Sequence, residues 1–142
     1  MSSLTAAISA SASALNVERT RIEVAVSNIA NAESTRGPDG QPYRRRDVIL
    51  ASDDISTFDA TLGRASATGV KVSAVVEDQT PFRRRYEPSH PDADADGFVS
   101  LPNVDAPQEM VDMLGAARAY QANLAAISMI KELVAKALEL GR

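Results

Sequence analysis

The sequence predicts an α+β fold in which long helices at the two ends of the chain pack as a coiled-coil-like pair, with a small β-rich insert between them. Both ends lack proline and repeat apolar residues every seven positions, as paired helices do. All 7 prolines of the 142-residue chain lie between Pro38 and Pro107. We therefore expect an N-terminal helix at residues 1–35, a β-rich insert with loops at 36–107, and a C-terminal helix at 108–142.

The first helix has one apolar face along its whole length. Large aliphatic residues recur at seven-residue steps, at Ile8, Leu15, Ile22 and Ile29. Many neighbouring positions are alanine or serine, and small residues let helix backbones approach closely, which favours packing against several helices. We therefore expect this helix to contact both the C-terminal helix and neighbouring copies of the chain.

The end of the first helix is rich in polar side chains, and two explanations fit it. Asn28 and Asn31 lie about one helical turn apart, where their amides could donate and accept hydrogen bonds across a helix interface. Alternatively, the helix end frays and its own polar side chains, including Ser34 and Thr35, cap it. The residues leave both explanations open. The turn-forming residues 36–40 then end the helix.

The insert contains three short segments that are typical of β-strands. Residues 46–50, 70–76 and 98–101 are enriched in β-branched or aromatic side chains and bounded by glycine or proline. Residues 51–68 are rich in Ser, Thr, Asp and Ala, and we expect a loop there, with room for a short helical turn.

The second helix repeats the seven-residue spacing of the first. Its apolar face runs through Met113, Tyr120, Ile127 and Val134. A second row on the same helical lattice contains Met110, Ala117, Leu124 and Leu138. We expect the helix to stop near Gly141, since glycine suits the position just past a helix end.

Charge and composition exclude several functional classes. The net charge of −4 and the isoelectric point near 5.0 argue against a general nucleic-acid-binding protein, which needs a positive surface to displace counterions. The chain has no cysteine for a disulfide or a thiolate metal site. Residues 1–14 have no basic cluster followed by an apolar run, which is the pattern of a secretory signal peptide. No segment approaches the roughly 20 apolar residues of a membrane span. We expect no membrane insertion.

An acidic segment suggests a weak calcium-binding module as the alternative function. Asp92, Asp94 and Asp96, followed by Gly97, match the first positions of an EF-hand loop. Position 12 of that loop is Asn103, where calcium needs a bidentate glutamate. The simpler interpretation is an aspartate-rich turn that leads into the strand at 98–101.

Two arginine triplets and one histidine complete the candidates. Residues 44–46 and 83–85 are all arginine, and arginines beside aromatic residues can bind single-stranded nucleic acid. On a strand, however, successive side chains point to opposite faces, so we favour salt bridges within the insert or across a subunit contact. His90 has no recognisable nucleophile or orienting carboxylate around it, and we expect a turn residue and no catalysis.

Several of these segments together resemble a known family. Residues 27–35 resemble the asparagine-rich signature near the amino terminus of flagellar rod and hook proteins. The similarity continues through residues 42–45, 86–104 and 109–123, and so covers essentially the whole chain. Ser34 stands where the signature more often has threonine, an exchange of one hydroxyl for another.

The resemblance implies a structural subunit of the proximal rod in the bacterial flagellar basal body, with no enzymatic activity and no cofactor. It implies export through the flagellar type III apparatus without a cleaved signal peptide, and assembly in the periplasm with copies of itself and other rod proteins. The terminal helices would form the axial tube that transmits torque. The residues that we expect at this assembly interface are Ile8, Leu15, Ile22, Asn28, Ile29, Asn31, Met113, Tyr120, Asn123, Leu124, Ile127, Val134 and Leu138.

Overall fold

The computed structural model describes residues 2–54 and 68–140. Within these ranges, two long helices flank four strands: α1 (Ser2–Ala30), β1 (Arg46–Asp54), β2 (Thr68–Glu77), β3 (Arg83–Tyr86), β4 (Phe98–Leu101) and α3 (Ala106–Leu140). The predicted α+β fold, with helices at both ends and a small β region between them, is confirmed.

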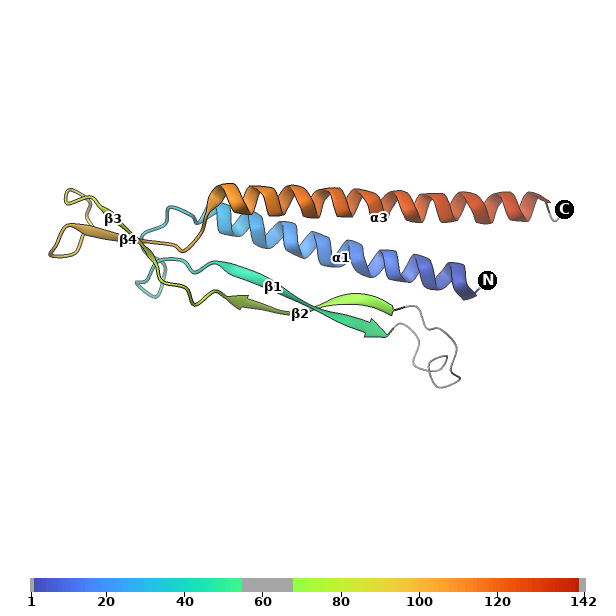
Figure 1. Ribbon diagram of the computed structural model, residues 1–142, viewed down its shortest axis with the longest axis horizontal. Coiled ribbons are helices and arrows are strands. Elements are labelled where there is room, and N and C mark those ends of the chain that lie inside the picture. Colours follow the sequence, from blue (N-terminus) through green and yellow to red (C-terminus); the bar gives the residue numbers. More distant parts are fainter. Residues whose placement is uncertain (1, 55–67, 141–142) are drawn as a thin grey trace.

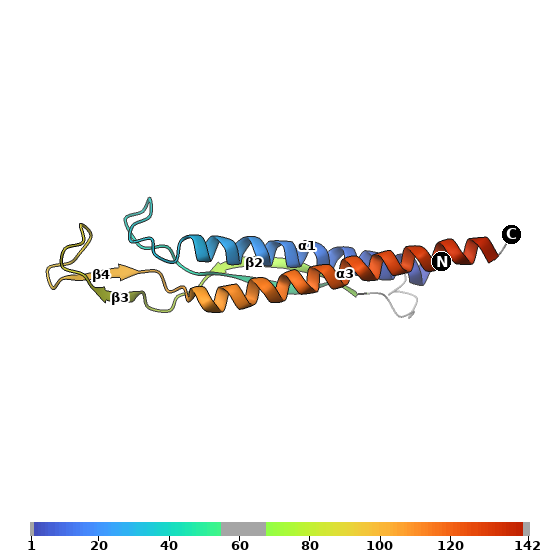
Figure 2. The same cartoon turned by 90° about the horizontal axis from the view of Figure 1, so that it is seen from above.

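The elements form an elongated molecule in which α1 is the middle layer. α3 lies along one side of α1, and the hairpin of β1 and β2 lies along the other (Figure 1). The two helices run in opposite directions, so the start of α1 and the end of α3 lie at the same end of the molecule. The hairpin of β3 and β4 lies at the opposite end, and the view from above shows the same arrangement (Figure 2).

Both hairpins are antiparallel. In the first, Arg46 pairs with Glu77, and the register shifts between Ile49 and Leu50, which marks a β-bulge. In the second, Tyr86 pairs with Phe98, and the two rings contact edge to face with centroids 5.3 Å apart. Each sheet has two strands, so each depends on the rest of the molecule for stability.

The strands at 46–50, 70–76 and 98–101 are confirmed, but the expected extent of the loop between the first two is wrong. The loop expected at 51–68 is narrower, because β1 continues to Asp54 and β2 already begins at Thr68. Pairing with β2 extends the ladder over residues whose own propensity for strands is low. The helical turn expected there falls in residues 55–67, outside the described residues. β3, an arginine-rich strand, was not predicted.

The helix boundaries follow local capping. α1 ends at Ala30, and the chain then turns through residues 31–33 before it extends. α3 begins at Ala106, with Pro107 in its first turn, where the missing N–H of proline costs nothing. The stop predicted near Gly141 lies outside the described residues.

The core is concentrated at the junction of the helices with the insert. Its buried apolar residues are Val17, Ala25, Ala32, Val99, Leu101, Val104 and Ala116. Among the described side chains, none within residues 4–16 of α1 or 117–140 of α3 is fully buried. The described helices include none that is long and apolar enough to span a membrane.

Candidate functional site

Asn28 is the centre of a buried polar cluster at this junction. It is fully buried, and its Nδ2 donates to the carbonyl oxygen of Arg46 and to Oε2 of Glu109, both at 2.9 Å. Its Oδ1 accepts from the Arg46 amide at 3.0 Å and from the Tyr43 hydroxyl at 2.9 Å. The carboxamide therefore uses both of its donors and both of its acceptor positions.

Glu109, in the first turn of α3, is the buried acidic residue of the cluster. It is 2 % exposed, and Oε1 accepts from Nε of Arg45 at 2.6 Å while Oε2 accepts from Asn28. Burial by itself lowers the pKa of the Arg45 guanidinium, but the hydrogen bond and charge of Glu109, together with the charges of Asp47 and Asp78, outweigh it and raise that pKa.

Asn103, which follows β4, extends the cluster to the loop before β3. Its Oδ1 accepts from the Arg45 amide at 2.8 Å, and its Nδ2 donates to Oγ1 of Thr80 at 2.8 Å and to the carbonyl of Asp78 at 3.1 Å. α1, α3, the start of β1 and the loop before β3 are thus joined by one set of hydrogen bonds. We call Asn28, Arg45, Asn103 and Glu109 the junction cluster.

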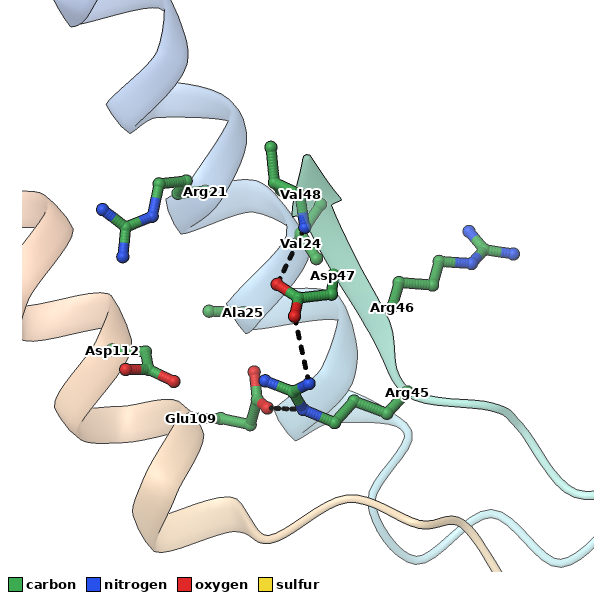
Figure 3. Close-up of a pocket in the computed structure, with 9 residues that line it drawn as sticks. All are labelled: Arg21, Val24, Ala25, Arg45, Arg46, Asp47, Val48, Glu109 and Asp112. Atoms are coloured by element: carbon green, nitrogen blue, oxygen red, sulfur yellow. Dashed lines mark hydrogen bonds and ion pairs between the residues drawn. The ribbon is translucent and has the colours of Figure 1, made fainter. Parts of the chain in front are cut away.

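A small cavity lies beside the junction cluster, between α1, β1 and α3 (Figure 3). Its volume is about 230 Å³. Arg45 and Glu109 face each other across one side of it, with Asp112 one turn further along α3, while the Arg46 side chain points away. Arg45 also lies 3.5 Å from Asp47, so its guanidinium bridges β1 and α3.

The two explanations for the asparagines each hold for one residue. Asn28 makes contacts across elements, as the interface explanation requires. Asn31 donates to the carbonyl of Ser27 in its own helix, and Ser34 in turn donates to the Asn31 carbonyl. Asn31 therefore acts as a helix-end cap, and Asn123 likewise bonds within its own helix, to Ala119.

The expected assembly residues differ in how far the single chain covers them. The eight at seven-residue spacing are half-buried: Ile8, Leu15, Ile22, Ile29, Met113, Tyr120, Ile127 and Val134. Leu124 and Leu138, from the second row of α3, are 50 % and 68 % exposed. α3 therefore has one row that the chain partly covers and another that it leaves open.

The acidic segment is occupied by contacts within the protein. Asp92 accepts from Oγ1 of Thr35 at 2.7 Å, while Asp94 accepts from the Phe98 amide at 2.8 Å and from Arg84 at 2.6 Å. Gly97 sits in the turn with a φ of 81°, a conformation that favours glycine. The arrangement is the aspartate-rich turn into β4, and the described residues contain no cluster that could hold a metal ion.

The arginine triplets form intramolecular contacts, as expected, but their partners are not confined to the insert. Each arginine contacts an acidic side chain, a carbonyl oxygen or a ring: Arg44 (Phe82 and Thr80), Arg45 (Glu109), Arg46 (Glu77 and Tyr43), Arg83 (Pro102 and Ala32), Arg84 (Asp94 and Phe98) and Arg85 (Glu33 and Glu87). Because Glu33 and Glu109 lie at the helix ends, the triplets also attach the insert to the helices.

Sequence reasoning missed Glu109, Arg45 and Asn103 as members of one cluster. One signal was present: Glu109 lies on the same side of α3 as Met113 and Tyr120, so a charged residue stands on the apolar face. Its two partners are 64 and 81 residues away in sequence, which is why periodicity could not identify them.

Two family models match segments at the two ends of the chain. Residues 8–38 match the family model "flagella basal body rod protein", and residues 95–140 match "flagellar basal body rod FlgEFG protein C-terminal". The chain is 46% identical to the flagellar basal-body rod protein FlgC of Salmonella typhimurium over 92% of each chain. It is 41% identical to FlgC of Bacillus subtilis, over 95% of this chain and 96% of the relative. For FlgC of Agrobacterium fabrum the identity is 39%, over 99% and 96%.

Proposed function

The chain belongs to the family of the flagellar basal-body rod protein FlgC, and we propose that it builds the rod through the exposed sides of its two terminal helices. Members of this family are structural subunits of the bacterial flagellar basal body, and the chain is such a subunit. The proposal concerns how the subunit assembles and which of its residues take part.

One observation carries the proposal: each helix contains a long stretch that has no charged residue and no fully buried side chain. Residues 1–17 and 119–130 contain no Asp, Glu, Lys or Arg. In the same regions, no described side chain between residues 4–16 or 119–130 is fully buried by the rest of the chain. A helix without charges on any side is stable in a buried environment, and neighbouring subunits would provide one.

The open row of α3 supports the same conclusion. Met110, Leu124 and Leu138 are at least half exposed, whereas Met113, Tyr120 and Ile127 are half-buried. We assign the half-buried row to contacts with α1 and the open row to contacts with neighbouring subunits. Contacts of this kind, in which different surfaces of identical or related subunits meet, generate open tubes.

The partners we propose are copies of this chain and other rod proteins, in a tube that transmits torque. Serine and alanine at many helix positions would let several helices pack closely. The proximal position in the rod, the periplasmic location and the export through the flagellar type III apparatus without a cleaved signal rest on the family alone.

The decisive variant is Leu124→Asp. Leu124 is half exposed in the single chain, so the folding of the subunit should be little affected, whereas a carboxylate in a packed subunit contact must be desolvated without a partner. Gln108→Asp is the control, because it adds the same charge to an exposed position of α3, outside the charge-free stretch.

The test is complementation of cells that lack their own copy of this protein. We expect motility and rod formation with Gln108→Asp and neither with Leu124→Asp, at equal expression. Normal rods assembled from the Leu124→Asp subunit would refute the proposed role of the open row.

A further inference from the structure

We propose that Glu109 is a positioning residue: through Arg45 and Asn28 it fixes the orientation of the β1–β2 hairpin relative to the helix pair. Mechanical load on the hairpin is then transmitted to the helices, and load on the helices to the hairpin, without bending the junction. The inference rests on the proposed function, in which neighbouring subunits hold the helices. The carboxylate of Glu109 provides the stiffness that a torque-bearing subunit needs between its hairpin and its helices.

Glu109 lies where α3 and β1 are connected. Among the described residues, α3 packs along α1, and α1 packs along β1 and β2, but α3 has no extended contact with either strand. The bond of 2.6 Å from Arg45, the residue just before β1, to Glu109 therefore joins the two outer layers directly. Removing that bond leaves the hairpin connected to α3 mainly through α1.

The second carboxylate oxygen of Glu109 connects α1, the middle layer, to the same side chain. Asn28 of α1 donates to it at 2.9 Å, and the same Asn28 bonds to both backbone groups of Arg46. Each layer is thus held by a directional bond that ends on Glu109 or Asn28. A change in the angle between layers must break at least one of them.

A buried ion pair fixes the orientation of the groups that it joins more than it stabilises the fold. Taking two charges out of water costs several kcal/mol, and well-packed apolar residues of similar volume often stabilise a fold as much or more. Hydrogen bonds to a buried carboxylate are short and directional, so they specify orientation where apolar packing between helix and sheet permits sliding. In the described residues no buried side-chain polar atom lacks a partner, so the cluster is complete as it stands.

Spin-label distances in the full-length free chain test the inference. The chain has no cysteine, so Ser73→Cys in β2 and Gly115→Cys in α3, both exposed and the latter with open space for a side chain, give one labelled pair without background. We expect a single narrow distance distribution, and loss of that narrow peak with Glu109→Gln. The matched control is Asp112→Asn, which removes one charge from the same cavity one turn further along α3 and should leave the peak narrow.

A rescue variant separates positioning from a general loss of stability. Asn28→Asp places a second carboxylate against Glu109 and should also broaden the distribution. Adding Glu109→Gln restores a donor opposite the introduced carboxylate and keeps an acceptor for Arg45. The double variant should therefore give a narrower peak than Asn28→Asp alone, although the Arg46 carbonyl still lacks its donor. A Glu109→Gln distribution as narrow as that of the unmodified chain, or a double variant no narrower than Asn28→Asp alone, would overturn the inference.

Complementation without labels then distinguishes this inference from the proposed function. If the unmodified chain fails to restore motility, the proposed function is wrong, whatever the distances show. If it succeeds, we expect Glu109→Gln to assemble rods but to lose swimming in viscous medium, where the load is high. Unimpaired swimming under that load, with a broadened distribution, would overturn the link between the cluster and torque.

Discussion

The buried side chain of Asn28 pairs with the backbone of Arg46 as a neighbouring β-strand would. Its Nδ2 donates to the Arg46 carbonyl at 2.9 Å, and the Arg46 amide donates to its Oδ1 at 3.0 Å. The first residue of β1 is therefore hydrogen-bonded to a helix through one side chain. Similar side chains cannot make the same pair of bonds: aspartate has no donor for the Arg46 carbonyl, leucine has neither a donor nor an acceptor, and glutamine is longer by one methylene.

Asn28→Leu should lower the free energy of unfolding by at least about 2 kcal/mol, because a buried polar group left without its partner costs about 1–3 kcal/mol. The groups left unpaired would be the amide and carbonyl of Arg46 and one oxygen of Glu109. Urea unfolding followed by circular dichroism measures the change.

Asn31→Ala is the matched control for that measurement. Asn31 is only half-buried and bonds within its own helix end, so its loss should cost less than about 1 kcal/mol. Equal effects of the two substitutions would contradict the distinct roles that the structure assigns to them.

The helices could be predicted from the sequence because their information is local and periodic. Seven-residue spacing is a property of each helix alone, and it located both of them. β3 could not be found in this way, because three arginines and a tyrosine form a strand only when β4 pairs with them. The junction cluster depends on contacts such as Asn28 with Glu109, and no spacing rule relates residues 81 positions apart.

Gly97→Ala should destabilise the second hairpin more than Gly40→Ala destabilises its turn. Both glycines have positive φ, 81° and 79°, so an alanine costs about 1–2 kcal/mol at either position. Around Gly40 the space is open, whereas at Gly97 a Cβ would lie 2.9 Å from Cε2 of Tyr86 and 3.2 Å from Cβ of Pro88. The difference in urea unfolding between the two variants isolates this contact, and equal stabilities would show that the hairpin accommodates it freely.

The second hairpin should loosen in acid through Asp94. The amide of Phe98 donates to this carboxylate, which is the main reason why its pKa lies below its usual value, and the guanidinium of Arg84 adds to the effect. A carboxyl group with a lowered pKa in the folded state contributes stability above its unfolded pKa of about 4, and this is lost as pH falls through the lower folded value.

Asp94→Asn provides the comparison for that titration. The variant retains an oxygen for the Phe98 amide but has no charge to lose, so its unfolding should depend less on pH between about 5 and 2 than that of the unmodified chain. Exchange of the Phe98 amide, followed by nuclear magnetic resonance, reports the hairpin locally. Identical pH dependence in the two chains would exclude Asp94 as the group that titrates.

Calcium at millimolar concentration should produce no heat of binding in titration calorimetry. Asp92 and Asp94 already accept hydrogen bonds from Thr35, Phe98 and Arg84, and Asn103, at position 12 of the motif, bonds to Arg45 and Thr80. A cation would have to displace these partners and would still lack a bidentate glutamate. Saturable heat that disappears with Asp96→Asn would revive the calcium-binding alternative.

The distal half of α1 should be disordered in the free subunit and become helical on assembly. Val17 is the first fully buried described residue of α1, and a helical segment whose side chains are at most half-buried must rely largely on its own propensity, which is marginal at this length. Several of its positions are serine, which competes for backbone hydrogen bonds and further weakens the helix. We therefore expect random-coil amide shifts from about Leu4 to Asn16 in the free chain, with protected amides around Asn28, where the junction cluster holds the helix in place. Protection that is uniform from Leu4 to Ile29 in a monomer would show that α3 alone stabilises α1, and that assembly adds contacts without ordering the chain.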